Sequence, residues 1–228
     1  MLDRSPRAVL FDAGNTLICL DFPLIARLLE GAGVTLTADE LARAEYHGRR
    51  AINATLGTSA PGTDSSRAYR YFSAILEGAG IAAGAIGPLF EIIRAHNATQ
   101  GLWRVVPPGG RAALEALKSR GIALGVISNA DGRVAAQLAA AGLSDVLDFV
   151  IDSHQVGVEK PDPRIFRMGL ERAGVAPADA VYVGDMYMID VVGARGAGLP
   201  GVLVDPLWLE SVDCPRVRTI AELPALLP

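Results

Sequence analysis

Apolar residues follow two different patterns along this chain of 228 residues, and the pattern changes near Trp103. Between about Phe22 and Gln100, apolar and polar residues recur at helical spacing, which predicts a block of helices. Thr37, with Glu40 three residues later, is typical of a helix start within this block. The helices are expected at residues 22–33, 38–56, 67–80 and 86–97, with a loop rich in Gly, Ser and Thr at 57–66.

After Trp103, short apolar runs alternate with amphipathic stretches, and one further apolar run, Arg7–Asp12, precedes the helical block. Strands are expected at residues 122–128, 149–152, 180–184 and 202–205 and near 217, and helices at 111–120, 132–141, 163–173, 190–196 and 221–227. Repeated βα units require a parallel sheet that is covered on both faces, and right-handed crossovers make it doubly wound. The predicted fold class is therefore α/β: a doubly wound, Rossmann-like parallel sheet formed by residues 1–17 and 101–228. Residues 18–100 are expected to be an inserted helical domain.

Composition narrows the classes of protein that this chain can belong to. Half of its residues are hydrophobic and 20% are charged, which suits a globular protein with an ample core. The formal net charge of −4 leaves no basic surface for nucleic acid or an anionic membrane. Cys19 and Cys214 are far apart and lack metal-ligand spacing, and no apolar signal segment opens the chain. We expect a cytoplasmic protein with no membrane or nucleic-acid partner.

Polar residues stand where several of the predicted strands end. Asp12 closes the first apolar run, Ser128 closes another, and Asp185 follows a third, with Asp190 five positions later. The carboxyl ends of parallel strands lie on one rim of the sheet, where ligands bind, so these side chains are expected to converge. An oxygen-rich cluster of carboxylates suits a hard cation such as Mg²⁺. Lys160, one of only two lysines in the chain, lies between two of these segments.

Four segments resemble, in order and spacing, the signature of the haloacid dehalogenase-like (HAD) hydrolases, most of which are Mg²⁺-dependent phosphatases. They are Val9–Leu17, Val126–Asn129, Glu159–Pro163, and Val183–Asp185 followed by Asp190. The resemblance implies that Asp12 is the nucleophile and forms an aspartyl phosphate, with Lys160 as the catalytic point charge. It also implies that Ser128, Asn129 and Lys160 bind phosphate.

The same resemblance implies a metal site and a cap. The ligands of Mg²⁺ would be Asp12, the backbone carbonyl of Gly14, Asp185, and Asp190 either directly or through water. The helical block, residues 18–100, would be a cap domain that contributes to substrate choice, and the substrate would be a small phosphorylated metabolite. A monomer or a homodimer is expected.

One residue departs from the phosphatase pattern, because Gly14 stands where the family usually has a second aspartate. That aspartate acts as general acid and base, which is worth about 10²–10⁴-fold in rate. The neighbouring Asn15 is no replacement, since an amide does not carry the proton. A glycine in this turn is also free to adopt a positive φ.

Three interpretations follow from Gly14. The favoured one is a Mg²⁺-dependent phosphohydrolase that is slow on alkyl esters or acts on a substrate with a good leaving group, unless a cap residue or the substrate itself donates the proton. A second is another HAD chemistry, such as a dehalogenase, but the intact Gly184-Asp185 and Asp190 argue against it. A phosphonoacetaldehyde hydrolase would need a cap lysine, and the chain has none before Lys118. The third is a catalytically weak or inactive module that binds a phosphorylated ligand or a partner protein.

Overall fold

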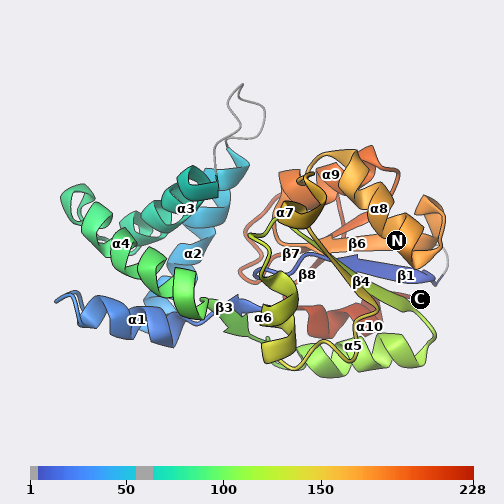
Figure 1. Ribbon diagram of the computed structural model, residues 1–228, viewed down its shortest axis with the longest axis horizontal. Coiled ribbons are helices and arrows are strands. Elements are labelled where there is room, and N and C mark those ends of the chain that lie inside the picture. The colour runs from blue at the N-terminus through green and yellow to red at the C-terminus, as the bar shows by residue number, and fades with distance from the viewer. Residues whose placement is uncertain (1–4, 55–63) are drawn as a thin grey trace. The chain divides into compact units, whose positions relative to one another are not determined.

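Strand β1 (Ala8–Phe11) lies inside a six-stranded sheet in the computed structural model, which describes residues 5–54 and 64–228 (Figure 1). The strand order is β5-β4-β1-β6-β7-β8, and every neighbouring pair is parallel. The other strands are β4 (Ala123–Ser128), β5 (Phe149–Asp152), β6 (Ala180–Gly184), β7 (Gly201–Val204) and β8 (Arg216–Val217). The predicted α/β class with a doubly wound sheet is confirmed.

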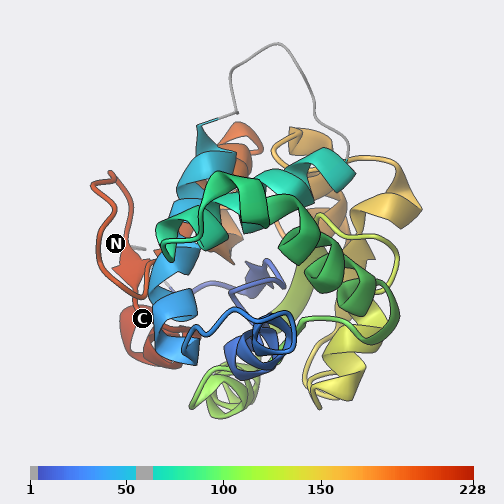
Figure 2. The ribbon, with the colours of Figure 1, turned by 90° about the vertical axis from the view of Figure 1, so that its left-hand side faces the viewer.

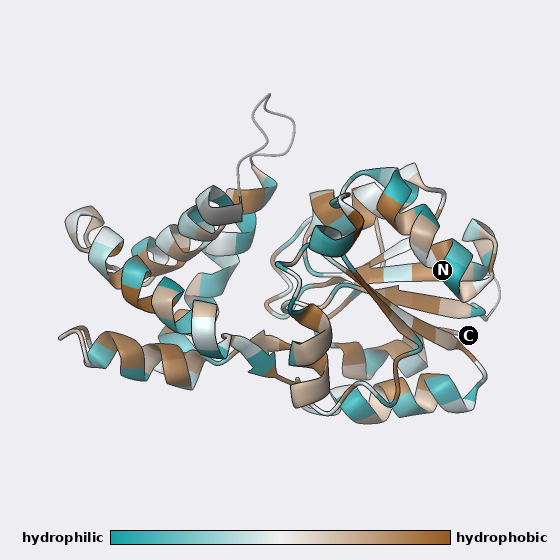
Figure 3. Ribbon diagram, in the orientation of Figure 1, coloured by the Kyte–Doolittle hydropathy of each residue, from teal (hydrophilic) through white to brown (hydrophobic). Residues whose placement is uncertain are grey.

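Helices cover both faces of this sheet. Helices α5 (Gly110–Ser119), α6 (Val134–Ala140) and α10 (Leu223–Leu226) lie on one side, and α7 (Ser153–Val156), α8 (Pro163–Ala173) and α9 (Val192–Gly196) lie on the other (Figure 1). Successive side chains of a strand point to opposite faces. Val9 and Phe11 accordingly pack in the core cluster of α5, α6 and α10, whereas Leu10 packs in that of α8 and α9. Burial on both faces explains why the strands are apolar along their length (Figure 3).

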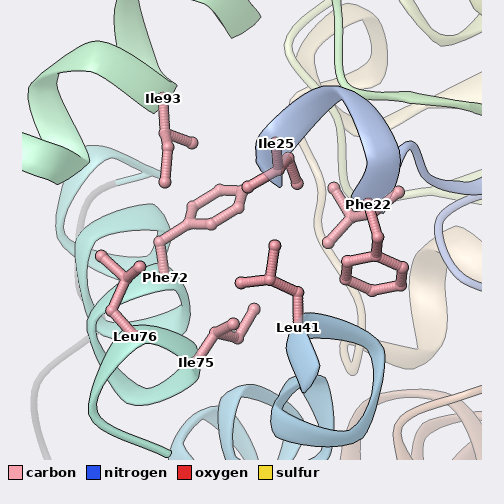
Figure 4. A pocket seen from close by; sticks show the side chains of 8 residues that line it. Phe22, Ile25, Leu41, Phe72, Ile75, Leu76 and Ile93 are labelled. Atoms are coloured by element: carbon pink, nitrogen blue, oxygen red, sulfur yellow. The ribbon is translucent and has the colours of Figure 1, made fainter. Parts of the chain in front are cut away.

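The chain divides into two compact units, and the helical one spans Leu20–Leu102. Its helices are α1 (Phe22–Glu30), α2 (Ala38–Asn53), α3 (Asp64–Gly78) and α4 (Ala83–Gln100) (Figure 2). Helix α2 begins with a capping box, because the Thr37 hydroxyl accepts from Glu40 N and the Glu40 carboxylate accepts from Thr37 N. Apolar side chains from all four helices, among them Ile25, Leu41, Phe72 and Ile93, fill the interior and leave no room for a water-sized sphere (Figure 4).

The structure differs from the expected elements in several places. A second, two-stranded sheet pairs β2 (Cys19–Leu20) with β3 (Trp103–Val105), and neither strand is long enough to show a sequence pattern. Residues 57–63 of the expected loop lie outside the described residues, and residues 64–66 belong to α3. The last helix is split into a 3₁₀ turn, η3 (Ile220–Glu222), and α10, while η1 (Pro177–Asp179) precedes β6. The helix expected at 190–196 is preceded by a π-helical turn, η2 (Tyr187–Val191), and begins at Val192.

Among the residues that the structure describes, no helix combines the length and the hydropathy needed to cross a membrane.

Gly125 of β4 pairs with Phe149 of β5, whose ring covers it. A Cβ at position 125 would lie 2.3 Å from Phe149 Cζ. We therefore expect Gly125→Ala to lower the free energy of unfolding by about 1–3 kcal/mol through overpacking, as measured by urea denaturation. Adding Phe149→Leu to the variant should recover part of the loss.

The matched control for this prediction is Gly84→Ala in α4, where a Cβ meets nothing within 4 Å. This substitution should be neutral or stabilise the protein by up to about 1 kcal/mol, because alanine favours the helix. A Gly125→Ala protein as stable as wild type would contradict the close packing of Phe149 on β4.

Candidate active site

Three aspartates meet at the carboxyl ends of two neighbouring strands. Asp12 directly follows β1 and Asp185 directly follows β6, and the Asp12 N–H donates to Val183 O at 2.8 Å. Carboxylate oxygens of Asp12, Asp185 and Asp190 lie within 4.8 Å of one another, and all three residues are buried. The parallel register of β1 and β6 thus brings together carboxylates that are more than 170 residues apart in sequence.

Lys160 lies among these carboxylates and is only 4% exposed. Its ammonium group donates to Asp12 Oδ1 at 2.6 Å, to Asp190 Oδ1 at 2.7 Å and to Tyr182 Oη at 2.9 Å. Each of its three protons therefore has an acceptor, so the position of the charge is fixed. The structure thus brings Lys160 and Asp12 into direct contact.

Tyr182 is a member of this site that sequence reasoning missed. It is a fully buried residue of β6, and its hydroxyl donates to Ile127 O at 2.9 Å while accepting from Lys160. A tyrosine inside an apolar run gives only the signal of a core residue, because its ring packs among the side chains of α8 and α9. Nothing in the sequence pattern distinguishes its hydroxyl from one that simply reaches solvent.

The sequence predicts Asp190 as the first residue of a helix, but in the structure it lies inside the π-helical turn η2. Its Oδ1 accepts from Lys160, and its Oδ2 accepts from the Met186 backbone N–H at 2.9 Å. The turn passes so close to β6 that a Cβ at Gly184 would lie 2.3 Å from Asp190 Cγ. The glycine before Asp185 is therefore required by the approach of the Asp190 carboxylate.

The two residues predicted to bind phosphate from the end of β4 have different surroundings. Ser128 is the last residue of β4 and is 5% exposed, but α6 begins only at Val134, so the expected helix N-terminus does not directly follow it. The Asn129 side chain is engaged with the Lys160 backbone. Its Oδ1 accepts from Lys160 N at 2.8 Å, and its Nδ2 donates to Lys160 O at 2.9 Å. In this structure, Asn129 positions the lysine.

The sequence allows a positive φ at Gly14, but in the turn after β1 the positive φ occurs at Asn15. Asn15 has a φ of 52°, in the left-handed region, whereas the φ of Gly14 lies outside that region. The glycine is therefore not needed for its backbone freedom. A Cβ at Gly14 would instead lie 3.3 Å from the indole Nε1 of Trp103, the first residue of β3.

Burial and charge shift the pKa values of this cluster. Burial raises the pKa of Asp12, Lys160 lowers it and Asp190 raises it, with a net pKa of about 6. Burial alone would lower the pKa of Lys160, but the carboxylates of Asp12 and Asp190 raise it well above its usual range. At neutral pH the site therefore holds an ionised lysine beside a mostly ionised nucleophile candidate.

The raised pKa of Asp12 predicts a pH-dependent loss of stability in the metal-free protein. Between the ordinary pKa of 3.8 and about 6, the folded state keeps a proton that the unfolded chain has released. The free energy of unfolding due to Asp12 should therefore fall as pH rises from about 4 to 7, by on the order of 3 kcal/mol. We would measure unfolding of wild type and Asp12→Asn in chelator across this range. A stability difference between the two proteins that does not change with pH would contradict the assignment.

Removing the Tyr182 hydroxyl should weaken the fold around Lys160. Tyr182→Phe leaves one ammonium proton and the Ile127 carbonyl without their partner, which should cost about 1–3 kcal/mol in the free energy of unfolding. The control is Tyr69→Phe, since Tyr69 is 46% exposed and its substitution should stay within about 0.5 kcal/mol of wild type. Equal effects of the two substitutions in urea denaturation would argue against the buried network.

Comparisons with known proteins point to one family. A model described as "haloacid dehalogenase-like hydrolase" matches residues 6–198. Haloacid dehalogenase-like hydrolase domain-containing protein 3 of Mus musculus is 37% identical over 150 residues, which cover 64% of this chain and 59% of that protein. The chain thus matches about three fifths of the length of the first curated relatives.

Two further matches span nearly the whole chain. The phosphoserine phosphatase of Thermus thermophilus is 33% identical over 225 residues, covering 87% of this chain and 88% of that enzyme. The crystal structure of a dehalogenase with an intermediate complex aligns with a TM-score of 0.70 at 22% identity, covering 99% of both chains, and this likeness shows the fold alone. With the family match extending from β1 to beyond α9, the chain belongs to the haloacid dehalogenase-like hydrolases.

Proposed function

We propose that this protein is a Mg²⁺-dependent phosphohydrolase that acts on a small phosphorylated metabolite through an aspartyl phosphate at Asp12. The observation that carries the proposal is the buried contact of Lys160 with Asp12 beside Asp185 and Asp190. The similarity to a phosphoserine phosphatase over most of both chains supports it.

The donor set fits a magnesium ion. Asp12 and Asp185 offer carboxylate oxygens within 4.8 Å, and Mg²⁺ takes one or two carboxylates together with waters and phosphate oxygens. The Gly14 carbonyl is the third proposed ligand. Both oxygens of Asp190 already accept hydrogen bonds, so its proposed contribution fits contact through a water. When bound, the ion would offset the charge of the phosphoryl oxygens as a carboxylate approaches them.

The residues of the chain have separate roles in this proposal. Asp12 attacks phosphorus, the bond from phosphorus to the leaving oxygen breaks, and water then displaces Asp12 to release phosphate. Lys160 holds the Asp12 carboxylate in place and stabilises the added negative charge. The Ser128 hydroxyl is proposed to donate to a phosphoryl oxygen, and Asn129 to act by fixing the lysine backbone.

Gly14 limits the leaving groups that suit this site. It offers no proton to a departing alkoxide, and the neighbouring Trp103 N–H is already donated to Asn15 Oδ1 at 3.2 Å. An aryl or acyl phosphate needs no such proton, because phenolates and carboxylates leave as stable anions. We therefore propose an aryl or acyl phosphate as the substrate class.

The helical unit is proposed to be the cap domain of this enzyme. Its chain is inserted after the loop that holds Asp12 and Gly14 and ends just before Trp103. A segment inserted there is connected at both ends to the residues of the site, so it is suited to select the part of the substrate that lies beyond the phosphate.

The proposal is tested by a phosphatase screen with Mg²⁺ across alkyl, aryl and acyl phosphates. We expect turnover of aryl or acyl phosphates, with alkyl phosphates slower by some part of the ~10²–10⁴-fold that a positioned acid–base supplies. Asp12→Asn should abolish turnover, and Asp185→Asn should raise the Mg²⁺ concentration required.

Asp145→Asn is the matched control for this screen, because Asp145 is an exposed partner of Arg111 and should leave activity unchanged. A folded wild-type protein that binds Mg²⁺ and phosphate but turns over none of these substrates would favour the third interpretation, a binding module. The observation that favours the binding module as a second candidate function is the lack of an acid–base side chain at Gly14.

A further inference from the structure

Trp103 connects by hydrogen bonds to the carboxylate cluster. Its indole Nε1–H donates to Asn15 Oδ1 at 3.2 Å, and Asn15 Nδ2 contacts Asp185 Oδ2 at 3.4 Å. All three residues belong to the unit that contains the six-stranded sheet. Because the indole is a donor only, it fixes which end of the Asn15 amide faces Trp103 and leaves the NH₂ group toward Asp185.

Asn15 is buried and has an unusual backbone conformation. It is 7% exposed, and its φ of 52° lies in a region that residues other than glycine rarely adopt. Asparagine is one of the few residues that tolerate this region, so the turn presents its amide to Trp103 and Asp185 at once.

Trp103 also occupies the space next to Gly14. A Cβ at position 14 would lie 3.3 Å from Trp103 Nε1, 3.5 Å from Trp103 Cδ1 and 4.0 Å from Asp12 Oδ2. The indole edge therefore lies where a side chain of residue 14 would start, on the side of the turn that faces the Asp12 carboxylate. The absence of a side chain at Gly14 therefore leaves the space that the indole of Trp103 occupies.

We propose that Trp103 is a positioning residue of the active site: it fills the space beside Gly14 and, through Asn15, holds the Asp185 carboxylate for the metal. The metal part of this inference rests on the proposed function. A side chain that orients a ligand carboxylate without touching the ion acts on metal affinity, and losing it typically costs about 10–100-fold.

The hydrogen-bonded chain is tested first in metal-free protein. The sequence has only two tryptophans, Trp103 and Trp208, so Trp208→Phe leaves a single indole N–H resonance in the NMR spectrum. In this background we expect Asn15→Gly to move that resonance, because the acceptor is removed. Glycine is chosen since it adopts the positive φ of Asn15 without strain. The control Asp145→Asn should leave the resonance in place, and an indole signal that ignores Asn15→Gly would overturn the proposal.

The metal part is tested by calorimetric titration with Mg²⁺. Trp103→Phe keeps an aromatic ring against the core but removes the donor, and both it and Asn15→Gly should weaken Mg²⁺ binding by about 10-fold. The double variant should be no weaker than the weaker single variant, because the two residues act in one chain. Trp208→Phe should bind as wild type does.

The outcomes separate this inference from the proposed function. Wild-type Mg²⁺ affinity in Trp103→Phe, or fully additive losses in the double variant, would overturn the positioning role even if the enzyme is active. A wild-type protein that binds no Mg²⁺, while its indole resonance responds to Asn15→Gly, would overturn the proposed function and support the hydrogen-bonded chain. Should Trp103→Phe fail to fold, Asn15→Gly carries both measurements, because it removes no apolar surface from the core.

Discussion

The buried ammonium group of Lys160 is the interaction on which the rest of this site depends. Carboxylates packed as closely as Asp12, Asp185 and Asp190 are costly to bury unless a cation compensates them. Lys160 compensates Asp12 and Asp190 directly, and its three hydrogen bonds, the third to Tyr182, connect the end of β1, the strand β6 and the π-helical turn. Removing one member of such a network leaves a buried partner without its hydrogen bond, which is costly.

Close approach between backbone segments is the second constraint. The Asp190 carboxylate reaches Lys160 and Met186 only because Gly184 has no side chain to block it. Phe166 and Pro161 approach Gly193 in the same way on the neighbouring α9. These glycines keep the segments of the site at hydrogen-bonding distance, whereas Gly14 leaves space for the indole of Trp103.

These contacts give the site a fixed charge distribution before any substrate arrives. Lys160 has an acceptor for each of its three protons and little exposure, so its charge is held in place. The proposed function has two tasks, nucleophilic attack and protonation of the leaving group. The residues proposed for the attack stand at the ends of the strands, whereas Gly14 offers no proton donor for the leaving group.

The sequence by itself determined the fold class and most of the candidate site. Runs of apolar residues that alternate with helical spacing require a parallel sheet, and a parallel sheet places Asp12, Ser128 and Asp185 on one rim whatever the detailed packing. The tertiary structure decided what those residues touch. From the sequence, Tyr182 is a core residue, whereas in the structure its hydroxyl accepts a hydrogen bond from Lys160. From the sequence, Asp190 begins a helix, whereas in the structure it belongs to a π-helical turn that packs against Gly184. Trp103 lies 88 residues from Asn15, and the positive φ falls on Asn15 and not on the glycine beside it. Periodicity records which face of an element is buried, but hydrogen bonds between distant segments depend on distances that only the packed chain sets.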